Sequence, residues 1–248
     1  MHIAVIGGTG LIGSQVVDIL TTRGHRAVPH SKATGLDLLT GSGVTEGLRG
    51  ADVVVNLISS PTFDEASPAF FRTTTDNLLM GAVAADVGHA VILSIVGVDR
   101  MPNIPYYRAR ALQEDILKAG PVPYSIVRAT QFFEFVDTVL SWTSDDRTVR
   151  LPTTPIRPIA AADVARAVAD VSMAAPLRGT VEVAGPDVFT LDELGRIALA
   201  AHHDDRTVVV DPDAGLFAAV PGDALLPRPG AVIAPTRFQD WSARVGVR

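Results

Sequence analysis

The segment HIAVIGGTGLIGSQVV, residues 2–17, decides the fold that this sequence predicts. It begins with an apolar run typical of a buried strand and ends with apolar residues at helical spacing. Between them, Gly7, Gly10 and Gly13 follow one another at intervals of three residues. Such glycines serve a tight turn, a close approach of backbone to a pyrophosphate, and close packing of helix on strand. The start of the helix offers free N–H groups to phosphates, so the segment predicts a dinucleotide site, with a turn that binds no ligand as the alternative.

The same alternation of apolar runs and helical patterns continues through the first half of the chain. Short apolar runs predict strands over 2–7, 25–31, 51–59, 89–97 and 123–129. Apolar residues at helical spacing predict helices over 11–24, 43–50, 64–88 and 106–120. Continuous apolar strands separated by helices indicate a parallel sheet covered on both faces. The predicted fold class is therefore α/β, a doubly wound parallel sheet.

The pattern is looser after residue 130. We expect helices over 130–142, 160–175 and 190–203 and strands over 147–152 and 179–186. Thr190 followed by Glu193 is a capping box that marks the start of the last of these helices. No linker or repeat is visible. We therefore expect a single domain over 1–248, with a small C-terminal substrate lobe built mainly from 130–160 and 185–248.

The composition excludes several classes of function. The net charge of −6 and the lack of a Lys/Arg cluster argue against nucleic-acid binding. There is no cysteine, which excludes disulfides and thiolate chemistry, and the histidines and acids show no metal-ligand spacing. The start of the chain leads directly into a strand and no apolar run is long enough to span a bilayer. We expect a cytoplasmic protein with no signal peptide, no membrane and no metal.

The residues after the second predicted strand bear on the choice of dinucleotide. Sites that prefer NAD usually place an acid there to hold the ribose 2′-hydroxyl. This chain has His30, Ser31 and Lys32 instead. A hydroxyl followed by a cation suits a 2′-phosphate, so NADPH is predicted in preference to NADH, with a solvated loop as the alternative. Asp37 lies in the next loop, where it suits a contact with the adenine amino group.

Several segments together resemble the atypical short-chain dehydrogenases/reductases, and more narrowly their NmrA-like NAD(P)H-binding branch. They are GGTGLIG (7–13), ADVVVNLISSP (51–61), ILSIVGVDR (92–100), PYYRARALQEDILKAG (105–120) and YSIVRATQFFEF (124–135). The resemblance implies a Rossmann-like sheet with NADP(H) across the ends of its strands. The residues expected to contact the cofactor are Gly7, Thr9, Gly10, Leu11, Ile12, Gly13, Ser31, Lys32, Asp37, Leu57, Ile58, Ser59, Ser94, Arg110 and Ala129.

The resemblance also implies a catalytic set. In the reductases of this class, a Ser polarises the substrate carbonyl and a Tyr donates the proton. A Lys four residues after the Tyr binds the nicotinamide ribose and lowers the pKa of the Tyr. Ser94, Tyr106 and Arg110 match these positions, except that Arg replaces Lys. Arg keeps the charge and can bond ribose hydroxyls, but it does not release a proton.

Two other interpretations of the same helix stay open. Tyr107 has the better spacing from Ser94, but Ala111 stands where its cationic partner would be. Tyr106 and Arg110 could instead form an ordinary surface stacking pair.

The predicted function is that of an NADPH-dependent oxidoreductase that reduces a small apolar carbonyl, quinone or imine. The substrate is expected to lie against Phe132, Phe133 and Phe135, with packing in the core as the alternative for these rings. The expected partner is a small molecule, and a homodimer stays open. Because Arg110 departs from the family pattern, two alternatives are kept: a non-catalytic NADP(H)-binding redox sensor, and a non-redox isomerase or cyclase on the same fold.

Overall fold

The computed structural model describes residues 1–245 and divides the chain into two compact units. The first comprises Met1–Arg128 and Val164–Val181, and the second comprises Ala129–Asp163 and Glu182–Arg248. The second unit overlaps the ranges expected for a substrate lobe, and its role in substrate binding stays a prediction. None of the helices within residues 1–245 is both long and apolar enough to cross a membrane.

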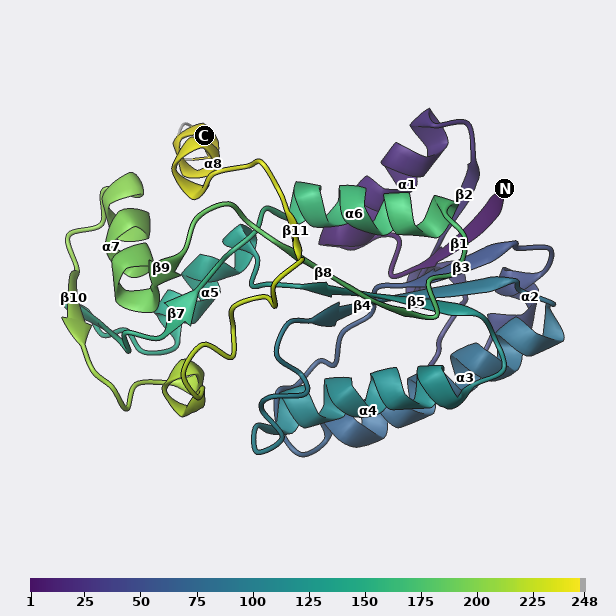
Figure 1. Cartoon of the computed structure of the whole chain (residues 1–248), viewed down its shortest axis with the longest axis horizontal. Coiled ribbons are helices and arrows are strands. Elements are labelled where there is room, and N and C mark those ends of the chain that lie inside the picture. The colour runs from purple at the N-terminus through teal and green to yellow at the C-terminus, as the bar shows by residue number, and fades with distance from the viewer. Residues whose placement is uncertain (246–248) are drawn as a thin grey trace. The chain divides into compact units, whose positions relative to one another are not determined.

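The first part of the chain alternates strands and helices as predicted (Figure 1). Its elements are β1 (His2–Ile6), α1 (Leu11–Thr22), β2 (Arg26–His30), η1 (Lys32–Thr34), α2 (Val44–Leu48), β3 (Val53–Asn56), α3 (Ser67–Ala84), β4 (His89–Ile95), α4 (Pro105–Ala119) and β5 (Tyr124–Ala129). The predicted strands and helices over 2–129 are thus all present, within a few residues of their expected bounds.

The remaining elements include several very short strands and helices, in agreement with the looser sequence pattern. They are η2 (Phe133–Phe135), α5 (Val136–Ser141), β6 (Thr148–Leu151), β7 (Pro155–Ile156), α6 (Ala161–Met173), β8 (Gly179–Ala184), β9 (Phe189–Thr190), α7 (Leu191–Ala201), β10 (Thr207–Val210), η3 (Leu216–Ala219), β11 (Val232–Ile233) and α8 (Phe238–Val245). The capping box of α7 is present, with the Thr190 N–H donating to Glu193 Oε2 over 2.9 Å.

One prediction for this part was too long. The helix expected over 130–142 is a single 3₁₀ turn followed by the six-residue α5. Its first residues are held as extended chain, because Phe132 pairs with Ile159 in a parallel bridge and the Phe133 N–H donates to the Ile159 carbonyl over 2.9 Å.

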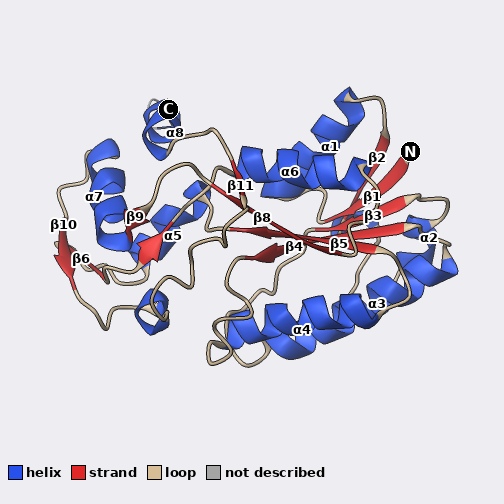
Figure 2. Cartoon of the chain, viewed as in Figure 1, coloured by secondary structure: helices blue, strands red, loops and turns tan. Residues whose placement is uncertain are grey.

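A seven-stranded sheet runs in the order β11-β8-β5-β4-β3-β1-β2. The pairings of β1 with β2, β1 with β3 and β3 with β4 are all parallel. Figure 2 shows α3 and α4 on one side of these strands and α1 and α6 on the other. The predicted doubly wound parallel sheet is confirmed. All four residues of β3 are buried, as expected for a strand covered on both faces.

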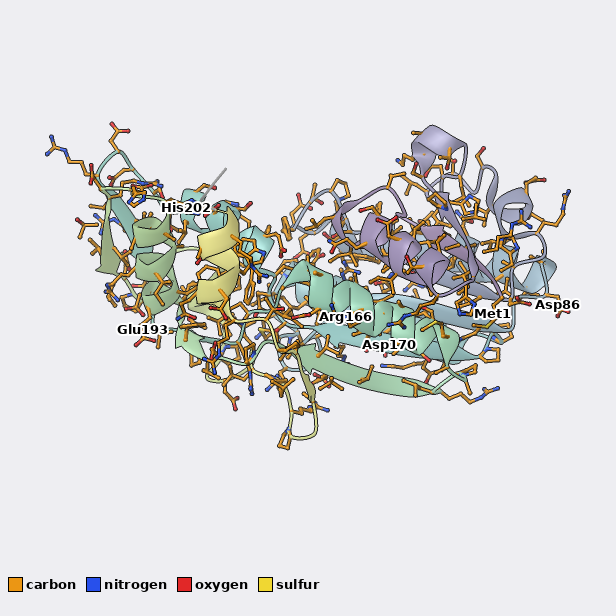
Figure 3. All side chains as sticks on the ribbon, turned by 90° about the horizontal axis from the view of Figure 1, so that it is seen from above. Met1, Asp86, Arg166, Asp170, Glu193 and His202 are labelled. Carbon is orange, nitrogen blue, oxygen red and sulfur yellow. The ribbon has the colours of Figure 1, made fainter. Side chains whose placement is uncertain are left out.

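The core of the first unit lies between the sheet and helices α2, α3 and α4. Ile6 of β1, Val54 of β3 and Ile126 of β5 belong to one buried cluster with Leu78 of α3 and Leu117 of α4. On the other face, Asp170 of α6, labelled in Figure 3, forms an ion pair over 2.5 Å with Arg23, the residue that follows α1. The sheet is therefore packed against helices on both faces, and the loops at the carboxyl ends of its strands are left to form a site.

Candidate active site

The glycine turn joins β1 to α1 by close backbone contacts that leave no room for a side chain at Gly13. Gly7 has a φ of +79°, which favours glycine, and its N–H donates to the His30 carbonyl over 2.9 Å. A Cβ on Gly13 would lie 2.0 Å from the Gly7 carbonyl oxygen. Gly10 caps α1 and offers no side chain, so the first N–H groups of the helix have no side-chain acceptor there. Free N–H groups at the start of a helix suit a phosphate, and pyrophosphate binding by Gly7–Gly13 stays a prediction.

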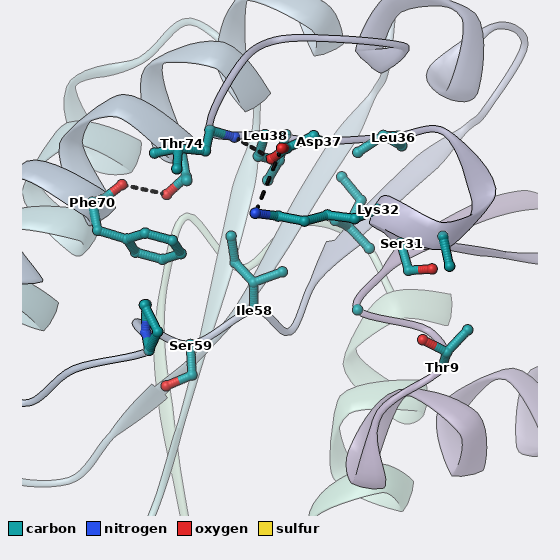
Figure 4. A pocket seen from close by; sticks show the side chains of 15 residues that line it. Thr9, Ser31, Lys32, Leu36, Asp37, Leu38, Ile58, Ser59, Phe70 and Thr74 are labelled. Carbon is teal, nitrogen blue, oxygen red and sulfur yellow. Dashed lines mark hydrogen bonds and ion pairs between the residues drawn. The ribbon is translucent and has the colours of Figure 1, made fainter.

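A cavity of about 470 Å³ opens beside this turn (Figure 4). The strand order reverses between β1 and β3, and ligands of open α/β sheets bind at such a point. The cavity is lined by residues that follow β1, β2 and β3 and by residues of α3, namely Ile6, Gly7, Thr9, Ser31, Lys32, Ala33, Leu36, Asp37, Leu38, Leu39, Ile58, Ser59, Pro61, Phe70 and Thr74. Seven residues predicted to contact the cofactor, Gly7, Thr9, Ser31, Lys32, Asp37, Ile58 and Ser59, are among them.

The other predicted cofactor residues lie at separate places. Gly10, Leu11, Ile12 and Gly13 form the start of α1, and Leu57 follows β3. Ala129 is buried in the last position of β5 and belongs to the second unit.

The cation predicted to bind a 2′-phosphate has an intramolecular partner. Lys32 Nζ lies 3.5 Å from Asp37 Oδ2, and the Lys32 side chain is 69% exposed. Asp37 is held in place because its Oδ1 accepts the Leu39 N–H over 2.8 Å. The sequence did not predict this contact of Asp37 with Lys32, because Asp37 was expected to contact the adenine amino group of the cofactor. A phosphate at Lys32 would therefore share this cation with Asp37.

Ser59, Tyr106 and Arg110 form a polar cluster in the first unit. The Ser59 hydroxyl lies 2.7 Å from the Tyr106 hydroxyl. Arg110 donates to the Tyr106 hydroxyl from Nε over 3.2 Å and from Nη2 over 3.0 Å, and Nη2 also donates to Ser59 Oγ over 3.3 Å. Tyr106 and Arg110 are only 7% and 6% exposed, so the pair is buried and does not lie at the surface, although the guanidinium lies 5.5 Å from the centre of the Tyr106 ring. Ser59 is exposed.

Arg110 is a buried cation whose donors are fully used. Its Nη1 donates to the Leu93 carbonyl over 3.2 Å and to Gln113 Oε1 over 3.0 Å. Together with the three bonds to Tyr106 and Ser59, these engage the five N–H groups that a guanidinium has. The guanidinium also lies 4.4 Å from the centre of the Phe71 ring. No N–H remains for the nicotinamide ribose unless one of these contacts breaks, so the ribose contact of Arg110 stays a prediction.

Ser94 takes part in a different network. It is buried and donates to Glu114 Oε1 over 2.7 Å. Arg128 donates to the same carboxylate from Nε over 2.8 Å and from Nη2 over 2.7 Å, and Lys118 Nζ lies 3.1 Å from it. Burial raises the pKa of Glu114, but the hydrogen bonds and charge of Arg128, with Ser94 and Lys118, outweigh burial and lower it. Ser94 thus stabilises an ionised glutamate.

The aromatic residues predicted to contact substrate belong to the second unit. Phe133 is 2% exposed and packs against Phe238 and Trp241, with ring centres 5.1 and 5.5 Å apart. Phe135 packs against Trp142 at 5.4 Å, and Phe132 is half-buried. Packing against Phe238 and Trp241 therefore explains why Phe133 is buried. Substrate contact by Phe132, Phe133 and Phe135 stays a prediction.

The sequence of residues 7–174 matches the NAD(P)H-binding protein family. The chain belongs to this family. This match confirms the resemblance of the sequence to the atypical, NAD(P)H-binding short-chain family.

Two known proteins are similar in sequence to parts of this chain. The chain is 32% identical over 113 residues to L-arabinose 1-dehydrogenase (NAD(P)(+)) of Haloferax volcanii, covering 42% of this chain and 44% of that protein. It is 27% identical over 151 residues to the photosystem II assembly factor Ycf39 of Trieres chinensis, covering 54% of this chain and 47% of that protein. This chain therefore spans less than half the length of either relative.

Solved structures share the fold across nearly the whole chain. An NADPH-dependent quinone oxidoreductase from Escherichia coli, complexed with NADPH, has a TM-score of 0.74 at 17% identity, covering 98% of this chain and 99% of that one. A dTDP-4-dehydrorhamnose reductase from Bacillus anthracis, in complex with NADP, has a TM-score of 0.77 at 15% identity, covering 99% and 98%. These similarities confirm the Rossmann-like fold.

The sequence did not single out several residues of the two networks. Gln113 and Glu114 lie three and four positions after Arg110, so helical spacing alone places them on its face. Arg128 is the charged residue of β5, a strand whose last five residues are all buried, and a charge in such a strand is a signal for a buried partner. Ser59 was expected only to contact the cofactor, and no periodicity in the sequence indicates its bond to Tyr106.

Proposed function

We propose that this NAD(P)H-binding protein is an NADPH-dependent reductase of a small apolar carbonyl, quinone or imine. The observation that supports this most is the Ser59–Tyr106–Arg110 cluster, which reaches the cavity through Ser59. A phenol held by a buried guanidinium beside a dinucleotide cavity is suited to donate a proton to a reduced substrate.

The cofactor would be held by residues already described. The turn of Gly7–Gly13 and the start of α1 would bind the pyrophosphate, and Ser31 and Lys32 would bind the 2′-phosphate. When bound, NADPH supplies the hydride. The preference for NADPH over NADH is part of the proposal and rests on Lys32 together with the absence of an acid at positions 30–32.

In the proposed reaction, Tyr106 is the acid and Arg110 holds it. Arg110 directs two N–H groups at the Tyr106 oxygen, which stabilises negative charge developing there. Ser94 keeps no role in proton transfer in this proposal, because its hydroxyl donates to Glu114. Tyr107 is buried, and its ring packs edge-on against Tyr106 with centres 6.5 Å apart.

The expected substrate is small and apolar. Phe63 is 42% exposed and its ring lies 4.8 Å from that of Tyr106, so an apolar ring borders the proposed acid. Phe132, Phe133 and Phe135 remain proposed as further substrate contacts. A cytoplasmic location, and a small molecule with no nucleic acid as the partner, belong to the same proposal.

A redox sensor without turnover is the second candidate. The observation that favours it is that the five N–H groups of Arg110 are engaged by protein acceptors, so the ribose contact made by the family Lys has no obvious substitute.

The test is a fluorescence titration of the protein with NADPH and with NADH, followed by NADPH oxidation assays with 1,4-naphthoquinone, benzaldehyde and acetophenone. The proposed function requires tighter binding of NADPH than of NADH and oxidation by at least one acceptor. Tight binding without oxidation would support the sensor instead. Product formation from a substrate with no change in NADPH absorbance would support an isomerase.

A further inference from the structure

The hydrogen bonds around Tyr106 determine which way its proton points. Arg110 is a donor only, so both of its contacts to the Tyr106 oxygen use lone pairs of that oxygen. The acceptor that remains for the Tyr106 proton, among the residues the structure describes, is Ser59 Oγ at 2.7 Å. Tyr106 is buried, and a buried hydroxyl without an acceptor is costly. The phenol therefore donates to Ser59.

This direction leaves the Ser59 proton free to point elsewhere. Ser59 Oγ accepts from Tyr106 and from Arg110 Nη2, so its lone pairs are used. Unlike Tyr106 and Arg110, Ser59 is exposed and lines the cavity beside the glycine turn. Figure 4 shows Ser59 on this cavity, across from Lys32 and Asp37. Its O–H is thus a donor available to a ligand or to water.

We propose that Ser59 is the catalytic residue that hands the proton to the substrate, as the outer member of a relay from Tyr106. This inference rests on the proposed reductase function. As the carbonyl carbon receives the hydride that bound NADPH would supply, the Ser59 proton moves to the carbonyl oxygen and the Tyr106 proton moves to Ser59. The resulting tyrosinate keeps both N–H bonds from Arg110 and is reprotonated from water through Ser59. The carbonyl, NADPH and one proton thus give the alcohol and NADP⁺.

The relay assigns different outcomes to two neighbouring serines. Ser60 is buried, accepts the Thr62 N–H over 3.3 Å and lies 3.2 Å from the Ser67 hydroxyl, so it is a matched control on the same loop. Ser59→Ala should lower kcat about 100-fold, within the usual contribution of an acid, and this loss should exceed any change in the Kd for NADPH. Ser60→Ala should leave kcat close to that of the wild type, and Ser59→Thr, which keeps the hydroxyl, should restore most of it.

Two further measurements separate a relay from a structural effect. Because the two groups act as one unit, Ser59→Ala combined with Tyr106→Phe should be no slower than Tyr106→Phe alone. Neutron diffraction of crystals exchanged into D₂O should place the Tyr106 deuterium toward Ser59 Oγ and the Ser59 deuterium toward the cavity.

Each result decides a separate point. A Ser59→Ala variant with wild-type kcat, or a Ser59 deuterium directed at the Tyr106 oxygen, would overturn the relay and leave the reductase proposal standing. A wild-type protein that binds NADPH but never oxidises it with any of the three acceptors would overturn the proposed function and the relay together.

Discussion

Arg110 is the residue at which this chain departs most clearly from the reductase pattern. Lys has three N–H donors where Arg has five, and the structure uses all five. Arg110→Lys should therefore leave buried acceptors unsatisfied and lower the free energy of unfolding by about 1–3 kcal/mol. Urea denaturation measures this change.

The control for that substitution lies on the same helix. Arg108 pairs with Glu65, and both side chains are exposed, so Arg108→Lys should cost at most about 1 kcal/mol. Equal losses from the two variants would mean that the five bonds of Arg110 contribute no more than a surface ion pair.

Lys32 carries the proposed choice between NADPH and NADH. Removal of a charge-assisted contact to a 2′-phosphate costs about 1.5–3 kcal/mol, so Lys32→Ala should weaken NADPH at least about tenfold. NADH has no such phosphate, and its Kd should hardly change. Lys32→Arg keeps the charge and should keep the preference. Fluorescence titration distinguishes these outcomes, and equal weakening of both cofactors would remove the assignment.

At the scale of elements, β5 and α4 are joined by a buried ion pair. Glu114 is fully buried and Arg128 donates to it twice, so removal of the charge leaves Arg128 without its main partner. Glu114→Gln should lower the free energy of unfolding by about 3–5 kcal/mol. Asp115→Asn is the control, because Asp115 is 72% exposed and its pair with Lys118 is a surface contact. Thermal unfolding that shifts equally in both variants would contradict a buried role for Glu114.

The elements themselves could be predicted from sequence, but their side-chain partners could not. The glycine turn and the apolar runs determine strand, turn and helix locally, so the sheet and its ligand edge follow from the sequence. Ser94 stands at the spacing expected of a catalytic Ser, yet spacing does not reveal competitors. Glu114, which is 20 residues away along the chain, accepts the hydrogen bond of the Ser94 hydroxyl.

Conversely, Ser59 reaches Tyr106 across 47 residues. A contact of that separation depends on how β3 and α4 are placed in the folded chain, and no local pattern encodes it. The same holds for Lys32, whose pairing with Asp37 depends on the path of the loop between them.

At the scale of the whole molecule, the buried groups predict how stability depends on pH. Burial lowers the pKa of His89 below its ordinary value of 6.5. Burial, followed by the charge of His2, lowers that of His30. A lowered pKa means that the unfolded chain binds the proton more readily than the folded one, so stability rises with pH. The contribution of these groups is complete above about pH 6.5 and is lost as the pH falls through their folded pKa values.

Glu114 gives the same sign in a lower window. Its pKa lies below the ordinary value of 4.5, so its contribution is complete above that value and is lost only at more acidic pH. Acidification should therefore weaken the fold in two steps. The first falls below about pH 6.5 and comes from buried His89 and half-buried His30, and the second falls below about pH 4.5 and comes from the ion pair of β5 and α4.

His89 allows the first step to be tested alone. Its Nε2 lies 2.8 Å from the Ser125 hydroxyl, which also accepts the Leu177 N–H over 2.9 Å, so Gln can keep a polar contact there without titrating. Urea denaturation from pH 7.5 to pH 5 should show a smaller loss of stability for His89→Gln than for the wild type, by at most about 1.4 kcal/mol per pH unit for one proton. His203→Gln, at an exposed position, should follow the wild type. If the His89→Gln and wild-type curves stay parallel, the early loss of stability on acidification comes from a group other than His89.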